Sequence, residues 1–443
     1  MKRFWYILFI ALFFLACLVP SVGMLIAGPS EAAANEVPAA VPRMKEFDGS
    51  WNKDVLTNLR DYIGKGFFLR LEGITGWNTI LKDVFRTSGK DDVLIGPDGW
   101  LFFVGAVNDI SGANQMSDRQ IWCAARGLAL MQEYAGSRGA EFVFTVPCGK
   151  YSLYPEHAPN YVTVAEGSNR ERLSAALTAQ GVHYADLYDV FTSVNGVLYW
   201  KWDSHWTERG AALGADTILA SVGIDSDFFS GPFTEELSHV GDLYEMLFPR
   251  GKAREASYSY TNGFAFVYTS NFRNYDDMLI TTECAGKDGS LMLFRDSSGR
   301  SLYPYLAESF GTAYISRSNS YRLDLIDEQG ATTVVAELAE RTLDYLLKYP
   351  AVYAAPVRDA SVLDGAVAAE TEIMADTSGN TSASLQKLTG TLPETADDSP
   401  VYVLVNDTVY EAIPNEGSFT LWLPIDIDAQ NAQAYFYAGQ NAA

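Results

Sequence analysis

The chain has 443 residues, of which 48% are hydrophobic, so it is long and apolar enough to bury a full core, and its length predicts two domains. This composition excludes a disordered scaffold. The net charge of −23 would repel a polyphosphate partner, so we expect no nucleic-acid binding.

The N-terminus starts with Lys2 and Arg3 and then runs apolar to Gly28, which is long enough to span a bilayer. The two cations favour a cytoplasmic N-terminus, so everything after about residue 30 is expected outside the membrane. We predict an uncleaved signal anchor over residues 1–28, with a cleaved signal peptide as the alternative. The protein is then either anchored at the cell surface or secreted. Residues 29–46, rich in Ala, Pro and Glu, predict a linker.

Three cysteines follow the apolar segment, Cys123, Cys148 and Cys284, and in an oxidising compartment they allow one disulfide and one free thiol. The sequence does not choose the pair. It contains no C-x-x-C, no H-E-x-x-H and no close histidine pair, so we expect no zinc or other metal and no cofactor.

Residues 47–85 have apolar positions at helical spacing and predict a helical lead-in to the main domain. Residues 93–103 predict a hairpin about a Pro-Asp-Gly turn. Strands then alternate with helices, which is typical of βαβ units and a mostly parallel sheet, and residues 225–290 predict an insertion or flap over that sheet. The predicted elements are helix 118–135, strand 141–146, helix 170–180, strand 182–187, helix 207–222, strand 290–294 and helix 301–310.

The composition changes after Pro356, and we predict a linker over residues 356–380 and a small β module over 381–443. Three aromatic residues of this module are candidates for glycan binding, but they alternate as core positions do, which favours packing. They are Tyr402, Tyr410 and Trp422.

Two short motifs together point to nucleophilic catalysis. Asp203 and His205 lie two residues apart before a predicted helix start, and Ser297 follows the buried strand at 290–294. A serine on a tight strand-to-helix turn lies beside unpaired amides that stabilise an oxyanion, although the same pattern fits an ordinary helix cap. Serine needs a base, and the base needs a carboxylate, which His205 and Asp203 would supply.

The chain also resembles a known family, the SGNH-hydrolase-like DHHW proteins that include alginate O-acetyltransferases of the AlgX and AlgJ kind. The resemblance covers roughly residues 50–350 and is carried by four ordered motifs. They are Ile95-Gly96-Pro97-Asp98-Gly99-Trp100-Leu101-Phe102, Val146-Pro147-Cys148-Gly149-Lys150, Asp203-Ser204-His205-Trp206 and Phe294-Arg295-Asp296-Ser297.

The resemblance implies a flavodoxin-like α/β fold over residues 47–355, a mostly parallel sheet flanked by helices, with catalytic residues Asp203, His205 and Ser297. Ser204 stands where many members have a second histidine, and we expect it to point away from its neighbours. Ser298 stands where an aromatic residue often follows the nucleophile, which leaves the choice between Ser297 and Ser298 open.

The sequence therefore predicts an O-acetyltransferase that acts on an extracytoplasmic polysaccharide through an acetyl-serine intermediate. The resemblance implies a membrane-bound protein as the acetyl donor. The alternatives are a polysaccharide acetylesterase and a non-catalytic glycan-binding or assembly protein on the same fold. Weaker candidates for substrate binding are Trp202, Trp206, Lys150 and Arg295, with core packing as the rival role for the tryptophans.

Overall fold

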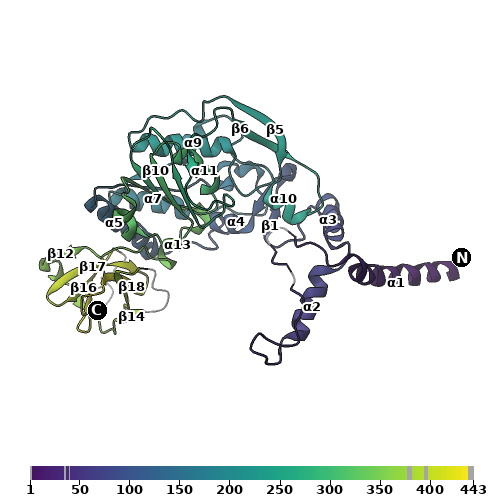
Figure 1. Cartoon of the computed structure of the whole chain (residues 1–443), viewed down its shortest axis with the longest axis horizontal. Helices are drawn as coiled ribbons and strands as arrows, with labels where there is room; N and C mark the ends of the chain where they lie inside the picture. Colours follow the sequence, from purple (N-terminus) through teal and green to yellow (C-terminus); the bar gives the residue numbers. More distant parts are fainter. Residues whose placement is uncertain (1, 34–35, 39, 377–381, 394–397, 438–443) are drawn as a thin grey trace.

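The computed structural model describes residues 2–33, 36–38, 40–376, 382–393 and 398–437. Its first element, α1 (Lys2–Ala27), is an apolar helix that projects from the body of the protein (Figure 1). From Arg3 to Ala27 it has a mean hydropathy of 2.6 and is long and apolar enough to cross a membrane, which is consistent with a signal anchor. Helices α2 (Val55–Gly66) and α3 (Arg70–Ile80) follow, and a π-helical turn (Leu81–Phe85) extends α3.

The central domain is built on a seven-stranded sheet in the order β4-β3-β11-β9-β10-β8-β7. The strands from β4 to β10 pair in parallel, whereas β8 pairs antiparallel with both β10 and β7. The predicted mostly parallel sheet is thus confirmed. The strands are β3 (Glu141–Thr145), β4 (Tyr184–Ala185), β7 (Val267–Tyr268), β8 (Leu279–Glu283), β9 (Ser290–Phe294), β10 (Thr312–Ser316) and β11 (Thr333–Glu337).

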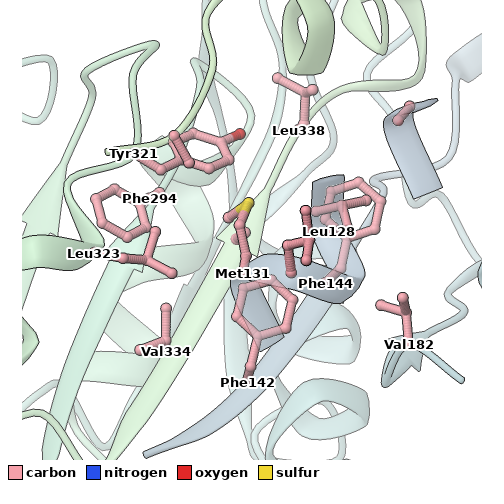
Figure 2. Close-up of a cluster of buried hydrophobic side chains, with 14 of the residues drawn as sticks. Leu128, Met131, Phe142, Phe144, Val182, Phe294, Tyr321, Leu323, Val334 and Leu338 are labelled. Carbon is pink, nitrogen blue, oxygen red and sulfur yellow. The ribbon is translucent and has the colours of Figure 1, made fainter. Parts of the chain in front are cut away.

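Helices cover both faces of this sheet. On one face α5 (Asp118–Ser137) and α7 (Asn169–Ala179) enclose a core in which Leu128 and Met131 lie over Phe142 and Phe144 (Figure 2). On the other face α9 (Glu208–Ser221) and α11 (Gly299–Ala307) enclose a second core. Both α5 and α7 begin with a capping box, formed by Ser117 and Ser168, which satisfies amides of their first turns. The domain is therefore an α/β/α sandwich.

Shorter elements connect these layers. The predicted hairpin is present as β1 (Val93–Ile95) and β2 (Leu101–Phe103), paired antiparallel. The others are α4 (Val104–Ile110), α6 (Lys150–Leu153), α8 (Tyr188–Ser193), α10 (Asp242–Leu247), α12 (Ile326–Gln329) and α13 (Tyr345–Lys348), with 3₁₀ turns at Pro97–Gly99, Pro155–His157, Leu323–Leu325, Glu340–Thr342 and Ala360–Leu363.

The segment 225–290 differs from the predicted flap. It forms an antiparallel hairpin of β5 (Phe233–His239) and β6 (Glu255–Tyr260), with α10 between them, and then supplies β7 and β8 to the edge of the main sheet. Strand β7 has only two residues, and β8 ends in Thr281, Thr282 and Glu283, so neither has the continuous apolar run of a buried parallel strand and the sequence did not reveal them.

The C-terminal module is an antiparallel β structure, with the strand order β13-β19-β16-β17-β18-β15-β14 and β12 paired to β17. It docks on α5, where the buried carboxylate of Glu411 accepts hydrogen bonds from Arg126 at 2.7 and 2.8 Å and from Arg358 at 2.7 Å. Tyr402, Tyr410 and Trp422 are all buried, which supports packing rather than glycan binding.

The strands of the module begin inside the segment expected as a linker, since β12, β13 and β14 all lie before residue 380. The complete set is β12 (Val357–Arg358), β13 (Val367–Ala368), β14 (Met374–Asp376), β15 (Leu385–Thr391), β16 (Val401–Val405), β17 (Thr408–Asn415), β18 (Ser418–Pro424) and β19 (Gln433–Phe436).

The expected disulfide is not formed. All four cysteines lie in the described part of the chain and all are free. Cys123, Cys148 and Cys284 are buried in separate places: the core under α5, the core under α9, and the end of β8. The physical reason is distance: Cys123 and Cys148 lie in different cores, and the thiol of Cys284 donates to the carbonyl oxygen of Glu308 at 3.7 Å.

Candidate active site

The predicted catalytic residues meet at the carboxyl ends of the central strands. Ser297 lies in the turn between β9 and α11, and Asp203 and His205 lie in the loop that leads into α9. Thr207 caps α9, with its hydroxyl accepting from the amide of Gly210 at 3.2 Å, and this fixes the end of the loop. The crevice beyond the carboxyl ends of parallel strands is the usual place for a site in such a sheet.

Asp203 and His205 form a close carboxylate–imidazole pair. The Nδ1 atom of His205 lies 2.8 Å from Oδ1 of Asp203, and the backbone N–H of His205 donates to the same oxygen at 2.9 Å. With its proton on Nδ1, the ring leaves Nε2 free to accept another. Within the part of the chain that the structure describes, this buried Nε2 has no hydrogen-bond partner. The pair therefore has the arrangement of a general base and the carboxylate that orients it.

A second histidine holds the other side of Asp203. The Nε2 atom of His239, at the end of β5, lies 2.9 Å from Oδ2 of Asp203, and the backbone N–H of Asp242 donates to that oxygen at 3.0 Å. The ring of His239 stacks on Trp200 with 3.6 Å between the ring centres. Asp203 is thus fixed by four nitrogen donors, and His239 was not among the residues predicted from the sequence.

The charges around the pair shift both pKa values. Burial raises the pKa of Asp203, but the hydrogen bonds from His205 and His239 outweigh it and hold the pKa well below its usual range. Burial lowers the pKa of His205, but its hydrogen bond to Asp203 and the charges of Asp203 and Asp242 raise it above its usual value overall. Asp203 is therefore the ionised partner, and His205 binds a proton more readily than a free histidine does.

Asp242, at the start of α10, extends this network. Burial and the charge of Asp203 raise its pKa. Its carboxylate accepts hydrogen bonds from the hydroxyl of Ser204 at 2.5 Å and from the amide of Ser204 at 2.8 Å. Ser204 had been expected to point away from its neighbours. Its hydroxyl instead lies between Asp242 and His205, 3.3 Å from Nδ1 of His205, because the donors of Ser204 satisfy a half-buried carboxylate.

The turn that carries Ser297 is held by Asp296. One carboxylate oxygen of Asp296 accepts from the amide of Ser298 at 2.7 Å, and the other accepts from the amide of Ala339 at 3.0 Å. Asp296 therefore ties the turn after β9 to the segment after β11. The guanidinium of Arg341 donates to the hydroxyl of Ser297 at 3.4 Å, which places a cation beside the candidate nucleophile.

Ser297 and His205 line one cavity of about 580 Å³. Ser298 does not line it: its side chain is buried, and its carbonyl accepts a hydrogen bond from the indole N–H of Trp206 at 2.9 Å. The geometry supports Ser297 as the nucleophile. The cavity is lined by Trp200, Asp203, His205, Glu208, His239, Val240, Asp242, Glu245, Phe264, Phe266, Tyr268, Tyr275, Ser297, Arg300, Ser301, Pro304 and Tyr305.

Two residues predicted to bind substrate are buried instead, which corrects the expectation. Trp206 has no exposed surface and packs on Phe191 in the core, so its ring faces are closed to a sugar. Lys150 is also buried, and its ammonium group donates to the carbonyl oxygens of Leu101, Lys201 and Asp203 at 2.6, 2.7 and 2.9 Å. Burial lowers the pKa of Lys150 to about 7, and this effect outweighs the nearby carboxylates, which raise the pKa. Its place is under the site, where it supports the loop of Asp203.

The other two candidates lie beside the cavity. Arg295 is buried and donates to the carbonyl oxygen of Tyr275 at 2.6 Å, so it supports a lining residue without reaching the cavity itself. Trp202 is half-buried, stacks on Tyr244 and lines a separate hollow on the hairpin side. The structure therefore brings together Ser297, His205 and Asp203 and leaves the four candidate binding residues outside their cavity.

Asp203, His205 and Asp242 also form a group whose potential metal ligands lie within 4.8 Å of one another. Both oxygens of Asp203 already accept N–H bonds, and Asp242 accepts from Ser204. A metal ion would compete with these N–H and O–H groups for the same carboxylate lone pairs. The three side chains therefore fit a hydrogen-bonded imidazole–carboxylate network better than a metal site.

Residues 93–276 match a family model described as the SGNH hydrolase-like domain of acetyltransferase AlgX. Over these residues the chain is similar to an SGNH hydrolase-like domain. The matched range includes Asp203, His205 and His239 and ends before Ser297, so the serine rests on the geometry of the turn and on its own short motif.

Among known proteins, the chain is similar to the probable alginate O-acetylase AlgJ of Pseudomonas aeruginosa, with 28% identity over 192 residues, which are 41% of this chain and 48% of that protein. The match thus spans about half the length of that relative.

Two solved structures are also similar. The O-acetyltransferase domain of Pseudomonas putida AlgJ aligns with a TM-score of 0.41 at 17% identity, and the alignment covers 57% of this chain and 92% of the AlgJ domain. A DHHW family protein from Eubacterium siraeum aligns with a TM-score of 0.43 at 16% identity, and the alignment covers 52% of this chain and 90% of the DHHW protein.

Proposed function

We propose that this protein is a polysaccharide O-acetyltransferase that works through an acetyl-serine intermediate on Ser297. The observation that carries the proposal is the shared cavity, in which Ser297 lies with a His205–Asp203 pair whose Nε2 atom is free to take a proton. The relatives with this domain type include proteins named as O-acetylases, which supports acetyl as the transferred group.

The proposed reaction has two steps. In the first, Nε2 of His205 takes the proton of Ser297 as its oxygen attacks the acetyl carbonyl of an ester or thioester donor, and the resulting imidazolium returns the proton to the departing oxygen or sulfur. In the second, His205 takes the proton of a sugar hydroxyl as that oxygen attacks the acetyl carbon, and the imidazolium returns the proton to the oxygen of Ser297 when the acetyl–serine bond breaks. Asp203 holds the imidazole and stabilises its charge in both steps. The guanidinium of Arg341 beside Ser297 would stabilise the oxyanion that forms in each.

The charge of the cavity bears on the acceptor. Three carboxylates besides that of Asp203 line it, those of Glu208, Asp242 and Glu245, whereas the lining arginine, Arg300, already faces Asp276 at 3.6 Å. Such a surface disfavours a polyuronate such as alginate through like-charge repulsion. Exposed rings of Phe264 and Tyr275 at the cavity offer flat faces for sugar stacking. We therefore expect an uncharged polysaccharide as the acceptor, with a membrane-bound protein as the proposed acetyl donor.

The test is turnover of p-nitrophenyl acetate by the purified chain, with Ser298→Ala as the matched control for Ser297→Ala. We expect Ser297→Ala and His205→Ala to abolish turnover and Ser298→Ala to keep most of it. Mass spectrometry of the Ser297 peptide should show an acetyl group trapped at low pH. If wild type is no faster than Ser297→Ala, the catalytic proposal fails and a glycan-binding role replaces it.

The acceptor is tested by adding oligosaccharides to the same assay. Acetylation of a neutral oligosaccharide, detected by its mass, identifies a transferase, whereas release of acetate alone identifies an esterase. A preference for oligouronate over a neutral oligosaccharide of equal length would contradict the charge argument while leaving the triad intact.

A further inference from the structure

Helix α2 exposes its apolar stripe. Leu56, Leu59 and Ile63 lie on one side of the helix, at the spacing that a core-facing stripe has, yet each is between 41% and 76% exposed. Thr57 and Asp61 lie on the opposite side. In an ordinary surface helix the apolar side faces the core, so this face of α2 lacks a partner within the residues that the structure describes.

The end of α3 repeats the pattern. Trp77, Ile80, Val84 and Phe85 follow the spacing of one helical side and are between 49% and 68% exposed. The other side of α3 is fixed to the central domain, where the buried amide of Asn78 donates to the carbonyl oxygen of Leu247 at 2.8 Å. The two exposed stripes form the surface that we call the juxtamembrane surface. Large apolar side chains exposed along two neighbouring helices mark a candidate interaction site.

The link between α2 and α3 contacts α1, the helix that is long and apolar enough to span a membrane. The ring of Phe68, between α2 and α3, packs against Gly23 of α1, and the amide of Phe68 donates to the carbonyl oxygen of Pro20 at 3.1 Å. Ser30 then donates its amide to the carbonyl oxygen of Gly66 at 2.8 Å. In Figure 1 α2 runs across the direction of α1 near the C-terminal end of α1, as a helix lying along a bilayer would.

The segment expected as a linker takes part in the same arrangement. Glu36 forms a largely buried ion pair with Arg70 at 2.8 Å, so this part of the chain is held against α3. The start of α3 is therefore held by this ion pair as well as by the contact of Phe68 with α1.

The charge of the segment agrees with this placement. Residues 43–92 contain nine lysines and arginines against eight acidic residues, whereas the rest of the chain contains 23 against 47. An anionic membrane would repel the rest of the protein but not this segment. An exposed tryptophan beside apolar residues, with Lys82 and Arg86 nearby, is also typical of a helix at a membrane interface.

We propose that the juxtamembrane surface lies in the outer face of the lipid bilayer, with Leu56, Leu59 and Ile63 of α2 and Trp77, Ile80, Val84 and Phe85 of α3 inserted among the acyl chains. Helices α2 and α3 then hold the central domain against the membrane in a fixed orientation, whereas a flexible linker would leave it free to move. This proposal is independent of the acetyl-transfer chemistry.

The test is spin-label accessibility in the full-length chain, reconstituted in vesicles of phosphatidylethanolamine and phosphatidylglycerol. Cys17 is first replaced by alanine, and nitroxides are attached at Leu59→Cys and Ile63→Cys, with Thr57→Cys and Asp61→Cys as matched controls on the opposite side. Leu12→Cys within α1 is the reference for lipid, and Ser361→Cys in the C-terminal module is the reference for water. All six positions are exposed in the protein, so the labels leave its core intact.

We expect labels at 59 and 63 to collide with oxygen rather than with a water-soluble nickel chelate, as Leu12→Cys does, and labels at 57 and 61 to behave like Ser361→Cys. If all four positions favour the nickel chelate, the segment is a solvated tether and the proposal is wrong. If 59 and 63 are shielded from both reagents, a second copy of the chain covers the stripe, and the proposal is again overturned.

Discussion

Replacement of Asp203 by asparagine tests the geometry of the site most directly. Asp203 accepts four N–H bonds, two on each oxygen, from His205, His239 and Asp242. Asparagine keeps the shape but has a single acceptor oxygen, and its amide N–H₂ meets the donors on the other side. Whichever way the amide turns, two donors lose their acceptor.

The structure sets the size of the effect. A hydrogen bond to a charged group contributes about 1.5–3 kcal/mol, so two lost bonds remove about 3–6 kcal/mol. If that loss falls on the transition state, the rate falls by about two to four powers of ten, since each 1.36 kcal/mol is a factor of ten. A fall in kcat with little change in KM is expected, because Asp203 is buried beneath the imidazole.

The assay is p-nitrophenyl acetate turnover at pH 8, with thermal unfolding to confirm that the variant is folded. Asp189→Asn, at an exposed position on α8, is the matched control and should keep wild-type rates. A folded Asp203→Asn variant within tenfold of wild type would refute the assignment of Asp203 as the residue that orients the base.

Three further predictions concern single side chains. Because the charge of Asp242 raises the pKa of His205, which must be neutral to act as a base, activity should rise as the pH passes above that raised pKa, and Asp242→Asn should move this rise to lower pH in a pH–rate profile. Arg341→Ala should lower kcat by about tenfold to a hundredfold, from the loss of a charged hydrogen bond to Ser297, with thermal stability nearly unchanged. Glu411→Gln should lower the free energy of unfolding by about 1.5–3 kcal/mol in denaturant titrations, because it removes the buried carboxylate that pairs with Arg126 and Arg358, while Arg358 keeps its pair with Glu133. It should not change the esterase rate of the folded protein.

The parts of the fold that the sequence predicted are those with a strong local pattern. The helices over 118–135 and 207–222 and the strands over 141–146 and 290–294 were found within a few residues, because each has an apolar period or a continuous buried run. The late antiparallel strands β7 and β8 were missed. Their pairing to β10 depends on partners distant in the sequence, and local periodicity carries no information about such partners.

The residues of the candidate site also fall into those that the sequence predicted and those that it did not. Asp203, His205 and Ser297 stood in recognisable motifs, and the structure brings them to one cavity. His239 stood in a polar strand with no motif, and only the shortage of histidines in the chain, four in 443 residues, gave a signal. The role of Trp206 was mispredicted because a tryptophan beside a candidate catalytic histidine fits sugar stacking and core packing equally well, and its complete burial decides for packing.

The burial of Trp206 has a consequence for how the site is assembled. The loop of Asp203 and His205 and the turn of Ser297 come from segments about 90 residues apart in the chain, and the indole N–H of Trp206 joins them by donating to the carbonyl oxygen of Ser298. Asp296 joins the same turn to the segment after β11. The buried hydrogen bond of Trp206 therefore holds the loop of the candidate base against the turn of the candidate nucleophile, and the partly buried bond of Asp296 fixes that turn from the other side. Acyl transfer gains from such a frame, because the transition state is stabilised only by groups that are already in place.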